Sequence, residues 1–239
     1  LQGLLIGSPD RHLHWEYQKV DVIHLDSALF MARMPDRTEL IDAEEQGKRI
    51  DGAVRQQWRT VLEDRKQKLP PADFVERFYA VARRQNLLDV LDDVPVVPRQ
   101  ACSVVVDYPT TADEQEQYLQ SPDSHVTREE VENGTTRLAA FSPYQKDESH
   151  ATLMYARAAG LTLVHTYLLG FEHWVTRELR DLDVEDIEVV AVEPGAEERF
   201  DGIFICEKVR LCDRFEIRHG TEVVTIRDDA LFHDEVILC

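Results

Sequence analysis

The spacing of the apolar residues changes along this chain, and that change constrains the fold more than any other feature. Between residues 38 and 66, apolar side chains recur at intervals of three and four, the period of an amphipathic helix. They are Ile50, Val54, Trp58, Val61 and Leu62. Thr38 is the expected N-cap, and Pro70-Pro71 ends the helical pattern.

Two further segments carry a helical pattern. Residues 71–94 predict a second helix, and the short proline joint before it favours a helical hairpin. Residues 148–181 are apolar on more than one face, which predicts a long central helix. Gly160 and Gly170 fall inside this third segment and mark either close packing or a break.

The other apolar segments have the length and composition of strands. They are 4–7, 12–26, 101–107, 135–141, 187–193, 200–211, 215–218, 221–226 and 231–238. The continuous apolar run at 101–107 is typical of a strand covered on both faces. Pro194-Gly195 predicts a turn, and His219-Gly220 predicts a two-residue hairpin turn.

These patterns together predict the α+β class. The first half is helix-rich and contains the helical hairpin, and an antiparallel C-terminal sheet of four to five strands packs on the long central helix. We expect one domain over 1–239, with a subdivision into 1–100 and 101–239 as the alternative.

Residues 110–133 contain few large apolar side chains, which predicts short helices on the protein surface. Within this segment, Thr127 followed at three residues by Glu130 forms a capping box, a signal for a helix start. Asn133-Gly134 is the matching signal for the end of that helix.

The composition restricts the partners of the chain. Its 239 residues carry 46 acidic and 27 basic side chains, a formal charge of −19. A hydrophobic fraction of 43% is enough for a buried core and excludes a disordered acidic chain. The charge argues against direct nucleic-acid binding and against attachment to anionic membranes, because both need clustered cations.

The cysteine spacing and the hydropathy indicate where in the cell the chain is expected. Four cysteines without a Cys-x-x-Cys pair exclude a zinc ribbon and a disulfide scaffold, so we expect them reduced and buried. No apolar run approaches the ~20 residues that a membrane span needs. We expect an intracellular chain, in the cytoplasm or an organelle interior. Because it begins with Leu1, an N-terminal targeting segment could have been removed.

One polar constellation near the N-terminus could hold a metal. His12, His14, His24 and Asp26 would converge if their segments formed a hairpin, and imidazoles with a carboxylate suit Zn²⁺ or Fe²⁺. The alternative is that these are ordinary histidines on the surface of a strand. Phosphate-binding loops, nucleophile elbows and His-Glu-x-x-His motifs are absent from the sequence.

Three functions remain open. The first is a non-enzymatic interaction or assembly protein, an acidic subunit of a larger complex with no cofactor, which binds a partner of basic surface. Its expected contact residues are Trp58 on the first helix and Glu129, Glu130 and Glu132 in the acidic segment. The second is a metal-dependent enzyme that uses the N-terminal cluster. The third is an acidic inhibitor or immunity-type protein that covers a basic site.

Overall fold

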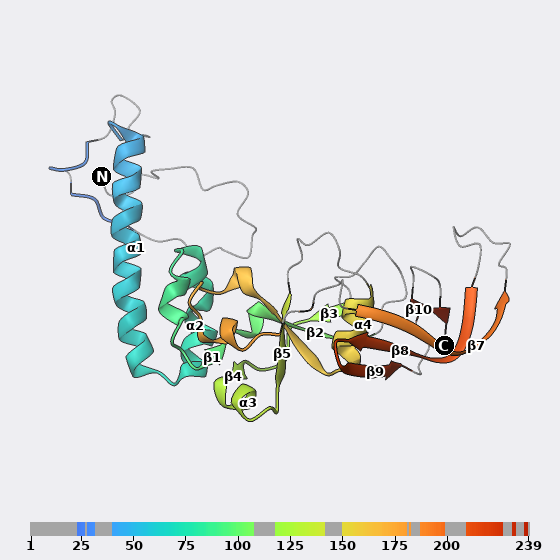
Figure 1. The fold of residues 1–239 in the computed structure, drawn as a ribbon. Coiled ribbons are helices and arrows are strands. Elements are labelled where there is room, and N and C mark those ends of the chain that lie inside the picture. Colours follow the sequence, from blue (N-terminus) through green and yellow to red (C-terminus); the bar gives the residue numbers. More distant parts are fainter. Residues whose placement is uncertain are drawn as a thin grey trace. The chain divides into compact units, whose positions relative to one another are not determined.

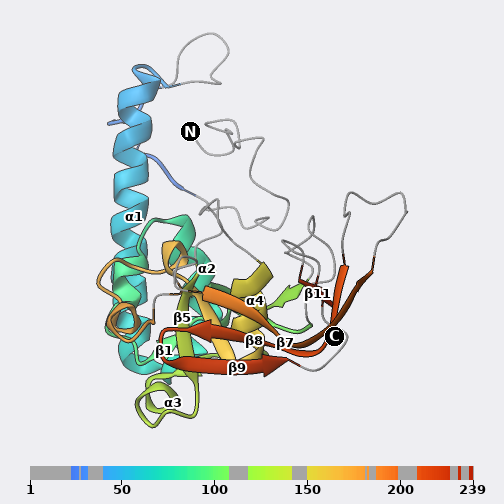
Figure 2. The same ribbon diagram turned by 45° about the vertical axis from the view of Figure 1, so that its right-hand side comes forward.

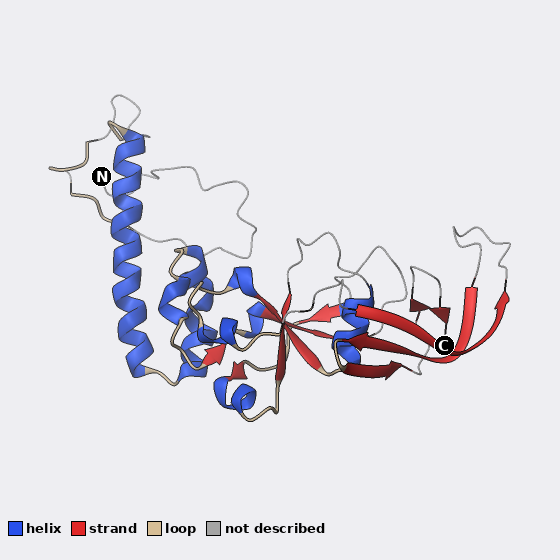
Figure 3. Ribbon diagram, viewed as in Figure 1, coloured by secondary structure: helices blue, strands red, loops and turns tan. Residues whose placement is uncertain are grey.

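The fold is taken from a computed structural model of the chain. It describes residues 23–26, 28–31, 40–107, 118–141, 150–180, 182, 187–198, 209–226, 231–232 and 237–238. The chain forms two compact units, Leu1–Val61 (unit 1) and Leu62–Cys239 (unit 2). Figure 1 shows the helices and strands along the chain. Long helices occupy 43–84 and long strands follow 187, which confirms the α+β class (Figure 3). That the chain forms a single domain stays a prediction.

The first helix, α1, runs over Ala43–Lys68 and agrees with the predicted amphipathic segment. Glu44 and Glu45 lie in its first turn and basic side chains lie in its last, the arrangement that the helix dipole favours. The predicted N-cap, Thr38, lies outside the described residues.

The second helix, α2 (Pro71–Arg84), starts with a proline in its first turn, where no backbone N–H is needed. It is shorter than the 71–94 that its apolar pattern predicts. Asn86 has a φ of 54°, in the left-handed region, so the chain leaves the helix there. The apolar residues that follow belong to a short 3-10 helix, Leu88–Leu91. Packing of α1 and α2 as a hairpin stays a prediction.

A four-stranded sheet in unit 2 has the order β3-β2-β6-β5. Its strands are β2 (Cys102–Val105), β3 (Leu119–Gln120), β5 (Arg137–Phe141) and β6 (Leu161–His165). β2 pairs antiparallel with both neighbours, and β5 and β6 are parallel. The predicted strands at 101–107 and 135–141 are therefore confirmed. Cys102, on β2, is a buried free cysteine, as expected.

The prediction of a single long helix over 148–181 is wrong. The structure has a nine-residue helix, α4 (His150–Ala158), followed directly by strand β6. Gly160 ends α4 with a φ of 64°, and its N–H donates to the Arg157 carbonyl at 3.0 Å. Beyond β6 the backbone forms two short 3-10 helices, Thr166–Leu168 and Trp174–Arg177.

The C-terminal sheet has five strands, the number expected, in the order β10-β11-β8-β7 with β9 paired to β8. They are β7 (Ile187–Glu198), β8 (Val209–His219), β9 (Glu222–Ile226), β10 (Leu231–Phe232) and β11 (Ile237–Leu238). Its pairs are antiparallel apart from β11 with β8, which is parallel. The hairpin between β8 and β9 is confirmed, but its two turn residues are Gly220 and Thr221, one position later than predicted, because His219 still pairs with Glu222. The turn expected at Pro194-Gly195 is wrong, because β7 continues through it with an irregular register.

Helix α4 packs between the two sheets, contacting β2 and β6 of one and β7, β8 and β9 of the other (Figure 2). The C-terminal sheet thus does pack on a central helix, although a short one. Residues 151–156 of α4 are buried, so the helix is surrounded by apolar neighbours. The opposite face of the β2–β6 sheet has its own core, which includes Cys102, Val164 and Trp174.

The described part of unit 2 also contains β1 (Val96–Val97), which pairs with β4 (Val126–Thr127), the 3-10 helix Arg99–Ala101 and α3 (Arg128–Glu132). The strand predicted at 4–7 and most of that at 12–26 lie outside the described residues, as does most of the strand predicted at 200–211. Within the described part of the chain, no helix has the length and apolar character that crossing a membrane requires.

Candidate functional site

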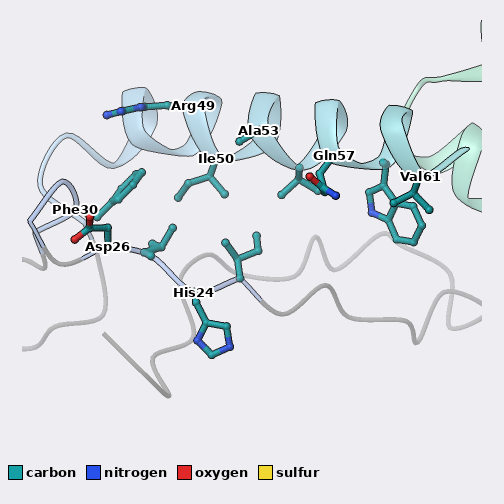
Figure 4. Close-up of a pocket in the computed structure, with 12 residues that line it drawn as sticks. His24, Asp26, Phe30, Arg49, Ile50, Ala53, Gln57 and Val61 are labelled. Atoms are coloured by element: carbon teal, nitrogen blue, oxygen red, sulfur yellow. The ribbon is translucent and has the colours of Figure 1, made fainter. Parts of the chain in front are cut away.

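An apolar cavity of about 730 Å³ lies in unit 1, between α1 and the segment 23–30 (Figure 4). Eight of its twelve lining residues are apolar: Ile23, Leu25, Phe30, Ile50, Ala53, Val54, Trp58 and Val61. The other four are His24, Asp26, Arg49 and Gln57. Ligand-binding and peptide-binding sites have this composition, an apolar wall with a few polar groups.

The helical period explains how α1 forms one wall of this cavity. Ile50, Val54 and Trp58 are four residues apart, so their side chains lie on one face of the helix. Trp58, the contact residue expected from the sequence, is half-buried in this wall. Near the start of the helix, the Arg49 guanidinium lies 5.4 Å from the centre of the Phe30 ring, a cation–π contact.

Large apolar side chains around this cavity are open to solvent. Ile23 lines the cavity, and Leu29 and Met31 flank the lining residue Phe30 in the sequence; all three are exposed, Met31 to 63%. Ile41, whose N–H donates to the Met31 carbonyl at 2.9 Å, is exposed as well. Single exposed apolar residues are common on protein surfaces, whereas a group of them beside an apolar cavity is typical of an interaction site. Unit 1 therefore carries the strongest candidate for a binding surface among the described residues.

The metal cluster predicted near the N-terminus is described only in part, because His12 and His14 lie outside the described residues. The ring of His24 points away from α1 (Figure 4). The Asp26 carboxylate accepts the Ala28 N–H at 2.8 Å and so stabilises a local turn. Among the described residues, no three metal-ligating side chains gather. The metal centre stays a prediction.

The acidic helix α3 uses two of its expected contact residues for its own structure. The Thr127 hydroxyl accepts the Glu130 N–H at 3.2 Å, and the Glu130 carboxylate accepts the Thr127 N–H at 2.7 Å. This confirms the capping box, and hydrogen bonds from Thr127 lower the pKa of Glu130. Glu132 lies 2.8 Å from Arg128 one turn earlier. A contact role for Glu129, Glu130 and Glu132 stays a prediction, although the first and third are exposed.

A serine and a histidine meet on the sheet of unit 2. The Ser103 hydroxyl on β2 lies 2.8 Å from Nε2 of His165 at the end of β6. Burial lowers the pKa of His165, so its ring is neutral at pH 7 and could accept a proton. A catalytic base is normally oriented by a third group, but Nδ1 of His165 is buried without a partner in the described structure. We interpret the pair as a structural hydrogen bond.

A charged cluster that joins the two sheets of unit 2 was not predicted from the sequence. Glu222 on β9 lies 2.6 Å from Arg180 and 2.8 Å from Arg137 on β5. Arg180 also lies 2.6 Å from Nδ1 of His219 and over the ring of Tyr155 on α4. Hydrogen bonds from Arg180 and then Arg137 lower the pKa of Glu222 to about 2. These residues come from β5, α4, the residues after the 3-10 helix Trp174–Arg177, β8 and β9, so no local sequence pattern marks them.

Replacing Glu222 with glutamine is expected to lower the free energy of unfolding by about 1–2 kcal/mol at pH 7, allowing for solvent screening of a side chain one-third exposed. The carboxylate has a depressed pKa, so its contribution is present above pH 4.5 and is lost as the pH falls towards 2. Urea unfolding measures the difference. Glu132→Gln, in an exposed pair, is the control and should cost at most about 0.5 kcal/mol. Equal effects of the two substitutions would contradict a role of Glu222 in joining the sheets.

Comparison with known proteins returns no match among protein-family models, curated proteins or solved structures. The function is therefore argued from the geometry of this chain alone.

Proposed function

We propose that this chain is a non-enzymatic, acidic subunit that binds a protein partner through the apolar cavity of unit 1. The observation that carries the proposal is the cavity of about 730 Å³ with its exposed apolar surroundings. Protein interfaces bury such groups at their centre, and an amphipathic helix with one apolar face is a common element of them.

The net charge of −19 supports a partner of opposite charge. Because complementary charge speeds encounter and disfavours acidic competitors, the partner is expected to present a basic surface around its apolar contact. Trp58 is the expected energetic centre of the contact, since tryptophan is enriched among the residues that contribute most to binding.

A photo-crosslinking residue in place of Gln57 tests the proposal in the full-length protein, because Gln57 is exposed and lines the cavity. We expect a cross-link to one other protein of basic charge, identified by mass spectrometry. Val54→Asp, which places a charge in the apolar wall, should reduce this product at least tenfold, since a buried unpaired charge is costly. Gln56→Asp adds the same charge at an exposed position outside the cavity lining and should leave the product unchanged.

Three outcomes would contradict the proposal. A cross-link confined to the chain's own residues would show that the cavity is filled internally, and a cross-link between two copies would show self-association. Equal loss of the product in Val54→Asp and Gln56→Asp would show that added charge, and not the apolar wall, governs binding. Circular dichroism of both variants verifies that α1 remains helical.

A further inference from the structure

Strand β9 forms one border of the C-terminal sheet (Figure 2). It pairs with β8 on one side, and in the part of the chain that the structure describes no strand pairs with its other side, the outer edge of β9. Because β8 and β9 form a two-residue hairpin, His219 and Glu222 exchange both backbone hydrogen bonds, and bonded pairs alternate from there. Val223 and Thr225 therefore direct their N–H and C=O groups outward, away from β8.

The other outer strands of the described sheets are protected against pairing with a further chain. β1, β3, β4 and β10 are only two residues long, and the backbone on the outer side of β5 is hydrogen-bonded to Arg180. β7 contains Pro194 and has an irregular register before Glu197, and both features hinder the addition of a strand. β9, by contrast, has a regular register and no proline or lysine, and its residues 223–226 are all β-branched.

The surface at this edge is apolar and locally neutral. Val223 is 49% exposed, and Thr225 is exposed as well. The described carboxylates on β9 and on the parts of β7 and β8 beside it are matched by arginines. The pairs are Glu222 with Arg137 and Arg180, and Glu188 and Glu216 with Arg218. Charges farther away than about 8 Å are screened at physiological salt, so the net charge of −19 opposes self-association only weakly here.

We propose that β9 pairs antiparallel with β9 of a second copy of this chain, about a two-fold axis at Val224. In this register Val223 of each copy exchanges both of its outward backbone hydrogen bonds with Thr225 of the other.

The side chains are complementary in the same register. Val224 faces Val224, Val223 faces Thr225, and Glu222 faces Ile226, so no two like charges lie opposite each other. The two C-terminal sheets then form one continuous sheet, the mode of association known as strand addition. The edge lies in unit 2 and uses no residue of the α1 cavity, so this dimer and the binding of a partner in that cavity are tested separately.

Analytical ultracentrifugation of the full-length chain over a range of concentrations tests the proposal. We expect an equilibrium between monomer and dimer. Thr225→Pro removes an outward N–H but none of the hydrogen bonds to β8, and it should raise the dissociation constant of the dimer at least tenfold. Thr225→Lys places a charge at the edge and should act in the same direction. Circular dichroism and urea unfolding verify that both variants remain folded.

Two further measurements separate strand pairing from other kinds of self-association. Phe171→Ser removes a fully exposed side chain outside the sheets, 101% open to solvent, and should leave the dissociation constant unchanged. In hydrogen exchange, the amides of Val223 and Thr225 should exchange at least tenfold more slowly in the dimer than in the monomer, because each becomes a donor to the second copy.

Four results would overturn the proposal. The first is a chain that stays monomeric at every concentration, which would leave the edge to a strand of another protein. The second is a dimer that forms equally well with Thr225→Pro and Thr225→Lys. The third is a dimer that Phe171→Ser dissociates. The fourth is hydrogen exchange of the Val223 and Thr225 amides that does not change with concentration.

Discussion

Acidification from pH 7 to pH 4 is expected to lower the free energy of unfolding of unit 2 by about 3 kcal/mol through His173 alone. His173 is 0% exposed, and its Nδ1 accepts the Val175 N–H at 3.3 Å at the start of the 3-10 helix Trp174–Arg177. Burial lowers the pKa of His173 from 6.5 to about 4, and the nearby Asp93 carboxylate opposes this only in part.

The direction of the effect follows from the depressed pKa. Between pH 6.5 and 4 the unfolded chain binds a proton at His173 that the folded chain does not bind. The contribution of the neutral ring is therefore complete above pH 6.5 and is lost as the pH falls towards 4. Protonation would also abolish the acceptor at Nδ1, which would leave the Val175 N–H without that partner.

The variant His173→Asn isolates this group from the other titrating residues. Asparagine does not titrate, and its side-chain oxygen is a good N-cap acceptor. We expect the variant to be less stable at pH 7, because a smaller side chain leaves a void. Its difference from the unaltered chain should shrink as the pH falls. Urea unfolding at several pH values gives the two curves, and parallel curves would contradict the assignment to His173.

Local patterns predicted the elements of this fold whose determinants are close in sequence. The two residues of the capping box, Thr127 and Glu130, are three positions apart in the sequence. The hairpin at Gly220 joins two consecutive strands through a two-residue turn. Strand β2 was predicted because a short continuous apolar run is typical of a strand covered on both faces. In the capping box and the hairpin the stabilising contacts form within a few residues, so sequence spacing is sufficient there, whereas β2 is recognised by its composition and pairs with the distant β6.

The expected helix over 148–181 shows where spacing is insufficient. Residues 161–164 are buried on both faces of the sheet, and an uninterrupted apolar run fits a buried helix as well as a buried strand. The two glycines in this segment were the decisive signals. Gly160 breaks the helix through its positive φ, and Gly170 allows close packing on Asp92.

The candidate sites could be predicted only in part, because they are formed by residues that are far apart in the sequence. The α1 wall of the cavity follows from the helical period, which is why Trp58 could be proposed from the sequence. The opposite wall comes from the segment 23–30, whose approach to α1 has no local signal. Phe171 falls inside the segment 148–181 that was predicted to be one helix, so its exposure could not be predicted from that pattern.

Replacing Gly170 with alanine is expected to lower the free energy of unfolding of unit 2 by about 1–3 kcal/mol, the cost of overpacking. A Cβ at this position would lie 2.0 Å from Oδ1 of Asp92 and 3.1 Å from the Leu88 carbonyl. The carboxylate or the backbone must therefore move. The backbone here is fixed by the bond from the Trp174 N–H to the Asp92 carbonyl, so little room for relaxation remains.

A double-mutant cycle with Asp92→Ala identifies the clash as the cause. Asp92→Ala alone removes an Oδ1 that is buried without a hydrogen-bond partner in the described structure, and it also removes the acceptor of the Glu172 backbone N–H, so we expect a cost of about 1 kcal/mol. In that background Gly170→Ala should cost less than it does in the unaltered chain, since the atoms that the new Cβ meets first are gone. Gly52→Ala, on α1 with open space around it, is the control and should be neutral or stabilise the helix by up to about 1 kcal/mol. An equal cost of Gly170→Ala with and without the Asp92 carboxylate would show that the packing of residue 170 on residue 92 does not limit stability.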